Sequence, residues 1–342
     1  MTVANGRAGA LLLTYGSPAS LDREDVRAYL ARVRGGREPH AGLVDEFTRR
    51  YLVIGGSPLV EIARAQAAAL ADSLGWPVEV GMRFSAPSIA DGMRNLAERG
   101  VEHIAAIVLS PQFSLMLMGG YAKALEDAQS VLGDRAPGVR LSGAWHDHPS
   151  FVAALGGGIR RALDRLGAHE RDAVAVLMTA HSLPRRVAEQ EPQYLDQLRA
   201  TANAVASAAR LEDADWSFCW QSAGHEPGEW MKPDFADLMP ELAAAGRRSV
   251  VVAPVQFLAD HLEILYDVDI GAREQAERYG LKFHRIESLN ADPGLIEALS
   301  SVARSVLTTG ADLGNSHRRQ VRRRGGQSHG RGGGCGRDLE AR

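Results

Sequence analysis

Short apolar runs alternate along the chain with longer stretches in which apolar residues return every three or four positions. The short runs predict buried strands, and the longer stretches predict amphipathic helices. This alternation is typical of an α/β protein whose parallel sheets are flanked by helices. We expect strands at residues 9–14, 77–83, 102–109, 139–143, 172–180, 214–220, 248–254 and 281–285.

Two pairs of segments resemble each other. LTYGSP at 13–18 is similar to TAHSLP at 179–184, and AIVLSPQF at 106–113 is similar to VVAPVQF at 251–257. Both pairs occur in the same order, which predicts two similar α/β halves. Because doubly wound sheets bind ligands beyond the carboxyl ends of their strands, we expect a ligand cleft between the halves.

The repeat also predicts the domain boundaries. We place an N-terminal Rossmann-like domain at 8–148 and a C-terminal one at 149–292, and we expect a helix at 293–308 to pack back on the first domain. Residues 310–342 are rich in Gly and Arg and hold almost no apolar side chains. Such a segment cannot bury enough surface to fold, so we expect a disordered tail.

Three carboxylates and an imidazole follow the apolar strand at 249–255 within eight residues, DHLEILYD. In an α-helix turning about 100° per residue, Asp260, Glu263 and Asp267 would lie within roughly 60° of one another. Like charges on one stripe repel unless a cation faces them, so the stripe predicts a path for a cation. The alternative is a solvated helix face, the usual role of such a stripe.

His181 ends a second apolar strand, at 173–180. A lone histidine there is more often a hydrogen-bonded structural residue than a ligand. Beside a carboxylate stripe, however, an imidazole suits binding of Fe, Zn, Co or Ni and also acid–base chemistry. Arg34 and Arg50, with the turn IGGSPL at 54–59, can hold a ligand with several carboxylates, unless these arginines are simply solvated.

Composition and charge exclude several classes of protein. The 342 residues are 45% hydrophobic and 24% charged, and they include no apolar run of eighteen residues, so we expect no transmembrane segment. The first residues do not resemble a secretory signal, so we expect a cytoplasmic protein. The net charge of −3 is uneven, because residues 311–342 carry eight Arg against three acidic residues (+5) and leave −8 elsewhere. We therefore expect no nucleic acid as partner of the globular part.

Five motifs, in chain order, closely resemble the ferrochelatase family over residues 9–308. They are YGSP at 15–18; RY at 50–51 with IGGSPL at 54–59; AHSLP at 180–184; WQS at 220–222 with Trp230 and Pro233; and DHLEILYD at 260–267. The resemblance implies two Rossmann-like domains that clamp a porphyrin, and insertion of ferrous iron, the metal substrate, into the macrocycle. Transient contact with other enzymes of the haem pathway would follow.

By resemblance, His181 and Glu263 bind the incoming iron from one face. Metallation must also remove two pyrrole protons, and which of these two residues accepts them is left open. Asp267, one helical turn beyond Glu263, would relay protons or metal toward solvent.

The family divides by substrate, and this chain resembles the coproporphyrin III enzymes in having Tyr15, whose oxygen can ligate the product iron from the opposite face. Four propionates would give several residues a partner, and these match the family's substrate contacts: Arg34, Arg50, Tyr51, Ser57 and Tyr121. We therefore expect coproporphyrin III as substrate and Fe-coproporphyrin III as product. The alternatives are a protoporphyrin IX ferrochelatase, a cobalt or nickel chelatase, and a non-catalytic haem or metal carrier.

The chain departs from some relatives in two respects. Gly271 stands where a further carboxylate extends the acidic stripe, which argues against an accessory metal site. Only Cys219 and Cys335 are present, where some actinobacterial relatives bind an iron–sulfur cluster through four cysteines. We expect no such cluster here.

Overall fold

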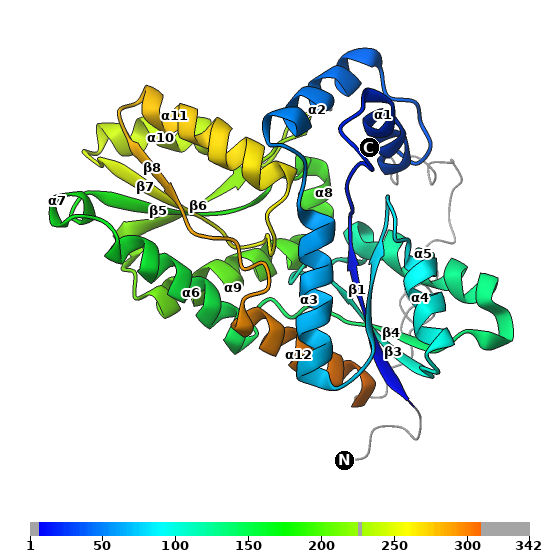
Figure 1. Cartoon of the computed structure of the whole chain (residues 1–342). Coiled ribbons are helices and arrows are strands. Elements are labelled where there is room, and N and C mark those ends of the chain that lie inside the picture. The colour runs from blue at the N-terminus through cyan, green and yellow to red at the C-terminus, as the bar shows by residue number, and fades with distance from the viewer. Residues whose placement is uncertain (1–6, 225–227, 309–342) are drawn as a thin grey trace, which may run out of the picture.

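A computed structural model describes residues 7–224 and 228–308 and contains two four-stranded parallel sheets. The first sheet has the order β2-β1-β3-β4 and the second the order β6-β5-β7-β8 (Figure 1). The strands are β1 (Ala8–Thr14), β2 (Val78–Met82), β3 (His103–Val108), β4 (Gly138–Leu141), β5 (Val174–His181), β6 (Trp216–Gln221), β7 (Ser249–Pro254) and β8 (Lys282–Arg285). The fold class predicted from the sequence is confirmed, and every expected strand has an observed counterpart.

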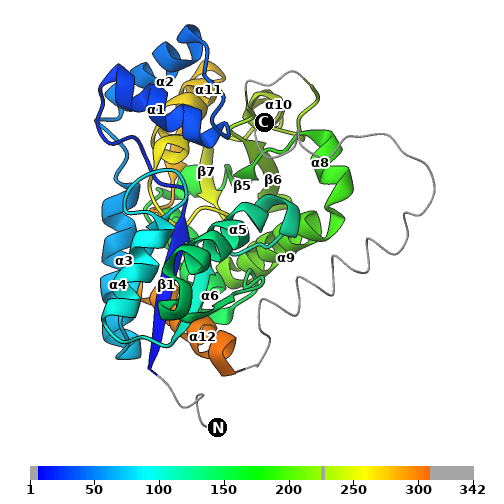
Figure 2. The same ribbon diagram turned by 90° about the vertical axis from the view of Figure 1, so that its right-hand side faces the viewer.

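Helices cover both sheets (Figures 1 and 2). They are α1 (Arg23–Val33), α2 (Ala41–Val53), α3 (Leu59–Leu74), α4 (Ile89–Glu98), α5 (Leu115–Leu132), α6 (Pro149–Asp164), α7 (Ala168–Arg171), α8 (Arg185–Gln190), α9 (Pro192–Ala209), α10 (Phe235–Ala244), α11 (Arg273–Arg278) and α12 (Pro293–Thr308). A π-helix spans Glu263–Ala272, and short 3₁₀ turns span Gly133–Arg135 and Asp213–Asp215.

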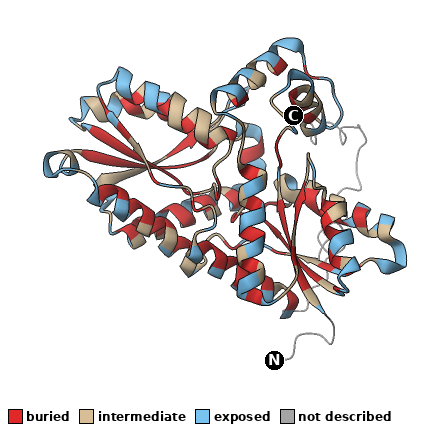
Figure 3. Cartoon of the chain, viewed as in Figure 1, coloured by how far each residue is buried: buried red, intermediate tan, exposed pale blue. Residues whose placement is uncertain are grey.

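The central strands, such as β5 and β7, form because their side chains are mostly apolar and buried on both faces, as parallel strands between helical layers require. Figure 3 shows this as buried strands under helices whose outer faces are exposed. In each sheet the chain order reverses between two central neighbours, β1 and β3 in one and β5 and β7 in the other. Ligands bind α/β sheets at such points, beyond the carboxyl ends of the strands.

One apolar core joins the two sheets. It includes Leu12 and Ile107 of the first sheet, Met178 and Val251 of the second, and Phe151 of α6 between them. The helix α12 packs against α3, β3 and α6, so the last described segment returns to the first sheet. The tail at 310–342 lies outside the described residues, as does Cys335.

The segment at 260–267 differs from the expected α-helix. Its helical part begins only at Glu263 and continues to Ala272 as a π-helix, with i→i+5 hydrogen bonds. Asp260 precedes it and accepts hydrogen bonds from Ser288 and Asn290. The expectation that Asp260 shares one stripe with Glu263 and Asp267 is therefore wrong, because Asp260 is engaged by the loop after β8.

Candidate functional site

His181 is the last residue of β5, so it lies at the carboxyl end of this central strand. Its backbone N–H donates to Gln256 Oε1 at 2.7 Å, which holds the residue in place. Its Nδ1 lies 2.6 Å from the carbonyl oxygen of Ser182. Because a carbonyl can only accept, Nδ1 carries the proton in the neutral ring, and Nε2 keeps a lone pair available as base or metal ligand.

Glu263, the first residue of the π-helix, faces that lone pair. Its Oε1 lies 3.7 Å from His181 Nε2, and its Oε2 lies 3.4 Å from His261 Nε2. Loss of water around the carboxylate alone would raise its pKa. The positive charges that His181 and His261 carry when protonated, and the hydrogen bond from His261, outweigh this and lower the pKa of Glu263 to about 2. Glu263 is therefore an anion at neutral pH.

His261 is a site residue that we did not select from the sequence, although it lies two residues before Glu263. Its Nδ1 donates to the carbonyl oxygen of Ala259 at 2.9 Å, while Nε2 faces Glu263. Burial lowers the pKa of His261, but the hydrogen bond with Glu263 and the charge of Glu263 raise it by more, so the net shift is upward. The arrangement favours a doubly protonated ring, which contacts the carboxylate oxygen of Glu263 that does not face His181.

These shifts predict how stability depends on pH. The pKa of Glu263 falls from 4.5 to about 2 on folding, so its ionisation stabilises the fold above pH 4.5, and this contribution is lost as pH falls through about 2. Glu263→Gln removes the titrating group. We expect the difference in unfolding free energy between wild type and variant to change between pH 4.5 and 2, as measured by urea unfolding. Glu297→Gln, at an exposed position of α12, should show no such change.

Asp267 lies one helical turn beyond Glu263. Its Oδ1 lies 3.3 Å from Nη1 of Arg50, which reaches it from α2. Burial raises the pKa of Asp267, and the charge of Glu263 adds to the shift, while a hydrogen bond from Ser222 and the charges of Arg50 and His181 oppose it. Asp267 is therefore easier to protonate than an ordinary aspartate, as a proton relay requires.

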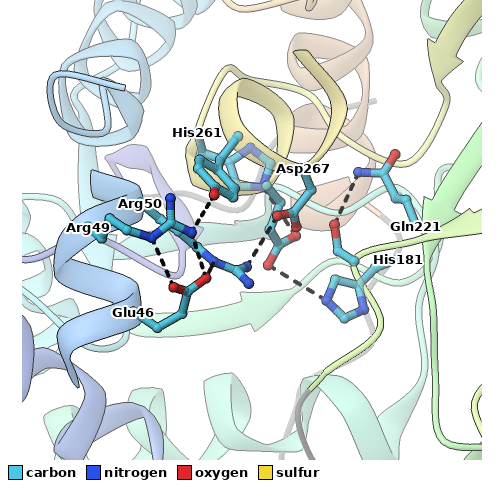
Figure 4. Close-up of polar contacts among 10 residues, drawn as sticks. Glu46, Arg49, Arg50, His181, Gln221, His261 and Asp267 are labelled. Atoms are coloured by element: carbon cyan, nitrogen blue, oxygen red, sulfur yellow. Dashed lines mark hydrogen bonds and ion pairs between the residues drawn. The ribbon is translucent and has the colours of Figure 1, made fainter. Parts of the chain in front are cut away.

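The helix α2 is clamped onto the π-helix. Glu46 accepts hydrogen bonds from Arg49 at 3.0 Å and Arg50 at 2.7 Å, and both guanidinium groups lie over the ring of Tyr266, at 5.3 and 5.1 Å from its centre. Arg49 also donates to the Tyr266 hydroxyl at 2.5 Å. Figure 4 shows these arginines entering the polar cluster from one side, with His181 on the other.

The remaining predicted residues come from the first half of the chain. Tyr15 follows β1, is 45% exposed and packs edge-on against Phe84 with ring centres 4.6 Å apart. Desolvation raises the pKa of Tyr15, Arg83 opposes the shift and Glu263 adds to it, so its hydroxyl lies within electrostatic reach of both. Tyr51 and Tyr121 are buried, and burial raises the pKa of each phenol.

Ser57 and Tyr51 line one pocket together with Ser17, Arg83 and Phe84. Arg34, in contrast, follows α1, and within residues 7–224 and 228–308 it makes no hydrogen bond or ion pair with the other predicted site residues. The buried Nε of Arg34 has no hydrogen-bond partner in that part of the chain.

Arg83 is a second residue that we did not select from the sequence. Its guanidinium lies over the rings of Phe84 at 4.8 Å and Tyr121 at 5.4 Å. It forms no ion pair with a carboxylate among the described residues. A half-buried cation over two aromatic rings, with no acid of its own among the described residues, suits an anionic ligand. The sequence did offer one indication: Arg83 directly follows β2, and ligands bind α/β sheets beyond the carboxyl ends of the strands.

This arrangement defines a class of protein: a two-sheet α/β protein with an imidazole lone pair facing an ionised carboxylate beyond the strand ends, which suits passage of a divalent cation together with proton transfer. The fold alone resembles SirB from Bacillus subtilis, solved with Fe³⁺, at a TM-score of 0.55 and 11% identity over 88% of this chain and 96% of that one.

The ferrochelatase family model matches residues 7–307. A ferrochelatase of Deinococcus radiodurans is 37% identical over 300 residues, covering 86% of this chain and 94% of the relative. A coproporphyrin III ferrochelatase of a Geobacillus strain is 33% identical, covering 88% of this chain and 98% of the relative. This chain belongs to the ferrochelatase family, whose members are metal-inserting lyases of haem biosynthesis that use ferrous iron as substrate.

In the described part of the chain, no helix combines the length and apolar character needed to cross a membrane.

Proposed function

We propose that this ferrochelatase inserts ferrous iron into coproporphyrin III, releasing two protons and forming Fe-coproporphyrin III. One observation carries the assignment of the site: the Nε2 lone pair of His181 faces the ionised Glu263 at 3.7 Å. An imidazole nitrogen beside a carboxylate is a suitable pair of ligands for iron in transit.

The metal is a substrate that must leave the protein, so a weak, incomplete site is appropriate. Within residues 7–224 and 228–308 no group of three or more His, Cys, Asp and Glu side chains is assembled to hold a metal ion. His181 and Glu263 would supply two ligands, and the porphyrin nitrogens would replace them as the metal enters the ring. The metal would bind the four porphyrin nitrogens more tightly than the two protein ligands, and this difference in affinity would drive its release from the protein.

The pKa values suggest how the protons leave. Glu263, with a pKa of about 2, is a weak proton acceptor and serves better as a fixed negative charge. Once the metal has passed to the porphyrin, the freed Nε2 of His181 is the better first acceptor for a pyrrole proton, and Glu263 would stabilise the imidazolium that forms. Asp267, whose pKa is raised, would accept the proton next and pass it outward.

The choice of coproporphyrin III rests on the supply of anion-binding groups. Tyr51, Ser57 and Arg83 line one pocket, and Arg83 also lies over the ring of Tyr121. Arg50 lies beside Asp267, and Tyr15, which packs on Phe84 next to this pocket, would ligate the product iron. Coproporphyrin III has four propionates, and protoporphyrin IX has two. Relatives that carry the name coproporphyrin III ferrochelatase support this choice, and others carry the name ferrochelatase only.

A comparison of substrates tests the proposal. With ferrous iron under anaerobic conditions, we expect kcat/KM for coproporphyrin III to exceed that for protoporphyrin IX by about tenfold or more, the effect of one charge-assisted hydrogen bond. Arg83→Met should reduce this ratio, because the guanidinium would bind a propionate that protoporphyrin IX lacks. Arg94→Met, at an exposed position of α4, is the matched control.

Equal or faster turnover of protoporphyrin IX would contradict the assignment of the substrate and leave the family membership intact. Tight porphyrin binding without metallation by the wild-type protein would instead favour a carrier.

A further inference from the structure

Asp260 belongs to a polar cluster with Ser288, Asn290 and Arg285. Its Oδ1 accepts a hydrogen bond from Ser288 Oγ at 2.6 Å, its Oδ2 accepts one from Asn290 Nδ2 at 3.0 Å, and its backbone N–H donates to Asn290 Oδ1 at 3.0 Å. This carboxylate is therefore fully engaged by the loop after β8, three residues before Glu263.

Arg285 joins that cluster to the π-helix. It is the last residue of β8, its side chain is only 13% exposed, and its Nη2 lies 3.3 Å from Asp260 Oδ1. The same guanidinium donates to both oxygens of Asp269, from Nε at 2.7 Å and Nη2 at 3.0 Å. A planar fork matched to a carboxylate in this way restrains orientation as well as distance.

The cluster is in turn tied to the first sheet. The carbonyl oxygen of Asn290 accepts a hydrogen bond at 2.7 Å from Nε2 of Gln66, a buried residue of α3. Asn290 has a positive φ of 47°, an unusual backbone conformation for a residue other than glycine. The loop that holds Asp260 is thus itself held in a specific conformation by the other half of the molecule.

We propose that Arg285 is a positioning residue for metal insertion, acting through Glu263. Asp260 and Asp269 flank Glu263 and Asp267 in the sequence, and Arg285 contacts both of these flanking carboxylates. π-Helices are rare and usually confined to short functional stretches, so this one needs restraint if Glu263 is to keep its 3.7 Å separation from His181. The inference rests on the proposed role of His181 and Glu263.

Arg285→Met removes the bridge and leaves two carboxylates without their shared cation. We expect kcat for metal insertion to fall about 10- to 100-fold, while KM for the porphyrin changes less than about threefold, because no porphyrin contact is lost. Arg285→Lys keeps the charge without the two-pronged geometry and should lose about 3- to 10-fold in kcat. If the Met variant does not fold, the Lys variant provides the test.

Arg273→Met is the matched control. Arg273 also reaches Asp269, but it donates only to the backbone carbonyl, at 2.9 Å, and forms no bridge to Asp260. We expect its kcat to stay within about twofold of wild type. All rates are divided by the folded fraction measured by circular dichroism, so that loss of fold is not counted as loss of positioning.

A double-mutant cycle with Glu263→Gln separates the two proposals. If Arg285 acts through Glu263, Arg285→Met should add little to the loss caused by Glu263→Gln. Independent, multiplicative losses would overturn the positioning role, and so would an unchanged kcat in both Arg285 variants. Full activity of Glu263→Gln alone would instead overturn the proposed iron site.

Discussion

His181→Ala is expected to lower the rate of metal insertion by about 10²- to 10⁴-fold, the usual contribution of a positioned acid–base group. The imidazole of His181 directs its Nε2 lone pair at Glu263. An alanine side chain offers neither a metal ligand nor a proton acceptor. Porphyrin affinity should change little, because the cations and phenols proposed to hold the propionates remain. Anaerobic metallation assays and porphyrin fluorescence quenching measure the two effects.

His169→Ala provides the control for this experiment. His169 lies exposed on α7, away from the site, and its removal should leave both rate and affinity unchanged. Retention of full activity by His181→Ala would rule out the proposed site, whichever porphyrin is the substrate.

Phe151→Ala should destabilise the protein by about 3 to 5 kcal/mol, the range observed when a fully buried phenylalanine is truncated. Phe151 is 0% exposed, its ring packs edge-on against Trp145 at 5.3 Å, and it belongs to the core that joins both sheets. Because that core is shared, the loss should appear in one cooperative urea transition for the whole molecule. Circular dichroism and tryptophan fluorescence should report the same midpoint.

Val131→Ala is the matched substitution at the surface. Val131 is 75% exposed, and its truncation should change the unfolding free energy by less than about 0.5 kcal/mol. A loss below about 1.5 kcal/mol for Phe151→Ala, or two separate transitions in the wild type, would contradict a single shared core.

The positions of the central strands were predictable because these strands are buried on both faces and therefore appear as continuous apolar runs. The repeat of short motifs indicated two similar halves, and the equal strand orders of the two sheets agree with it. His181 and Glu263 were chosen from motifs at strand ends, and the folded chain brings them within 3.7 Å. Their roles in catalysis stay a prediction.

Contacts between distant segments were not predictable. Asp260 was expected beside Glu263 because an α-helix was assumed, and the competing partners Arg285, Ser288 and Asn290 come from 25 or more residues later. Arg83 was overlooked because its value as an anion site depends on Phe84 and Tyr121 lying beneath it. Neither fact is encoded in local spacing.

The sequence by itself determined the alternation of strands and helices, the duplicated plan and the residue types at the strand ends, because these depend on local hydrophobic pattern and short motifs. Only the tertiary structure decided which carboxylate lies near His181, which arginine bridges to the π-helix and where α2 packs against it. Those features depend on side chains from separate elements, as when Arg50 and Asp267, 217 residues apart, meet at 3.3 Å. Such groups come together when the shared core folds, and the local sequence pattern does not specify these contacts.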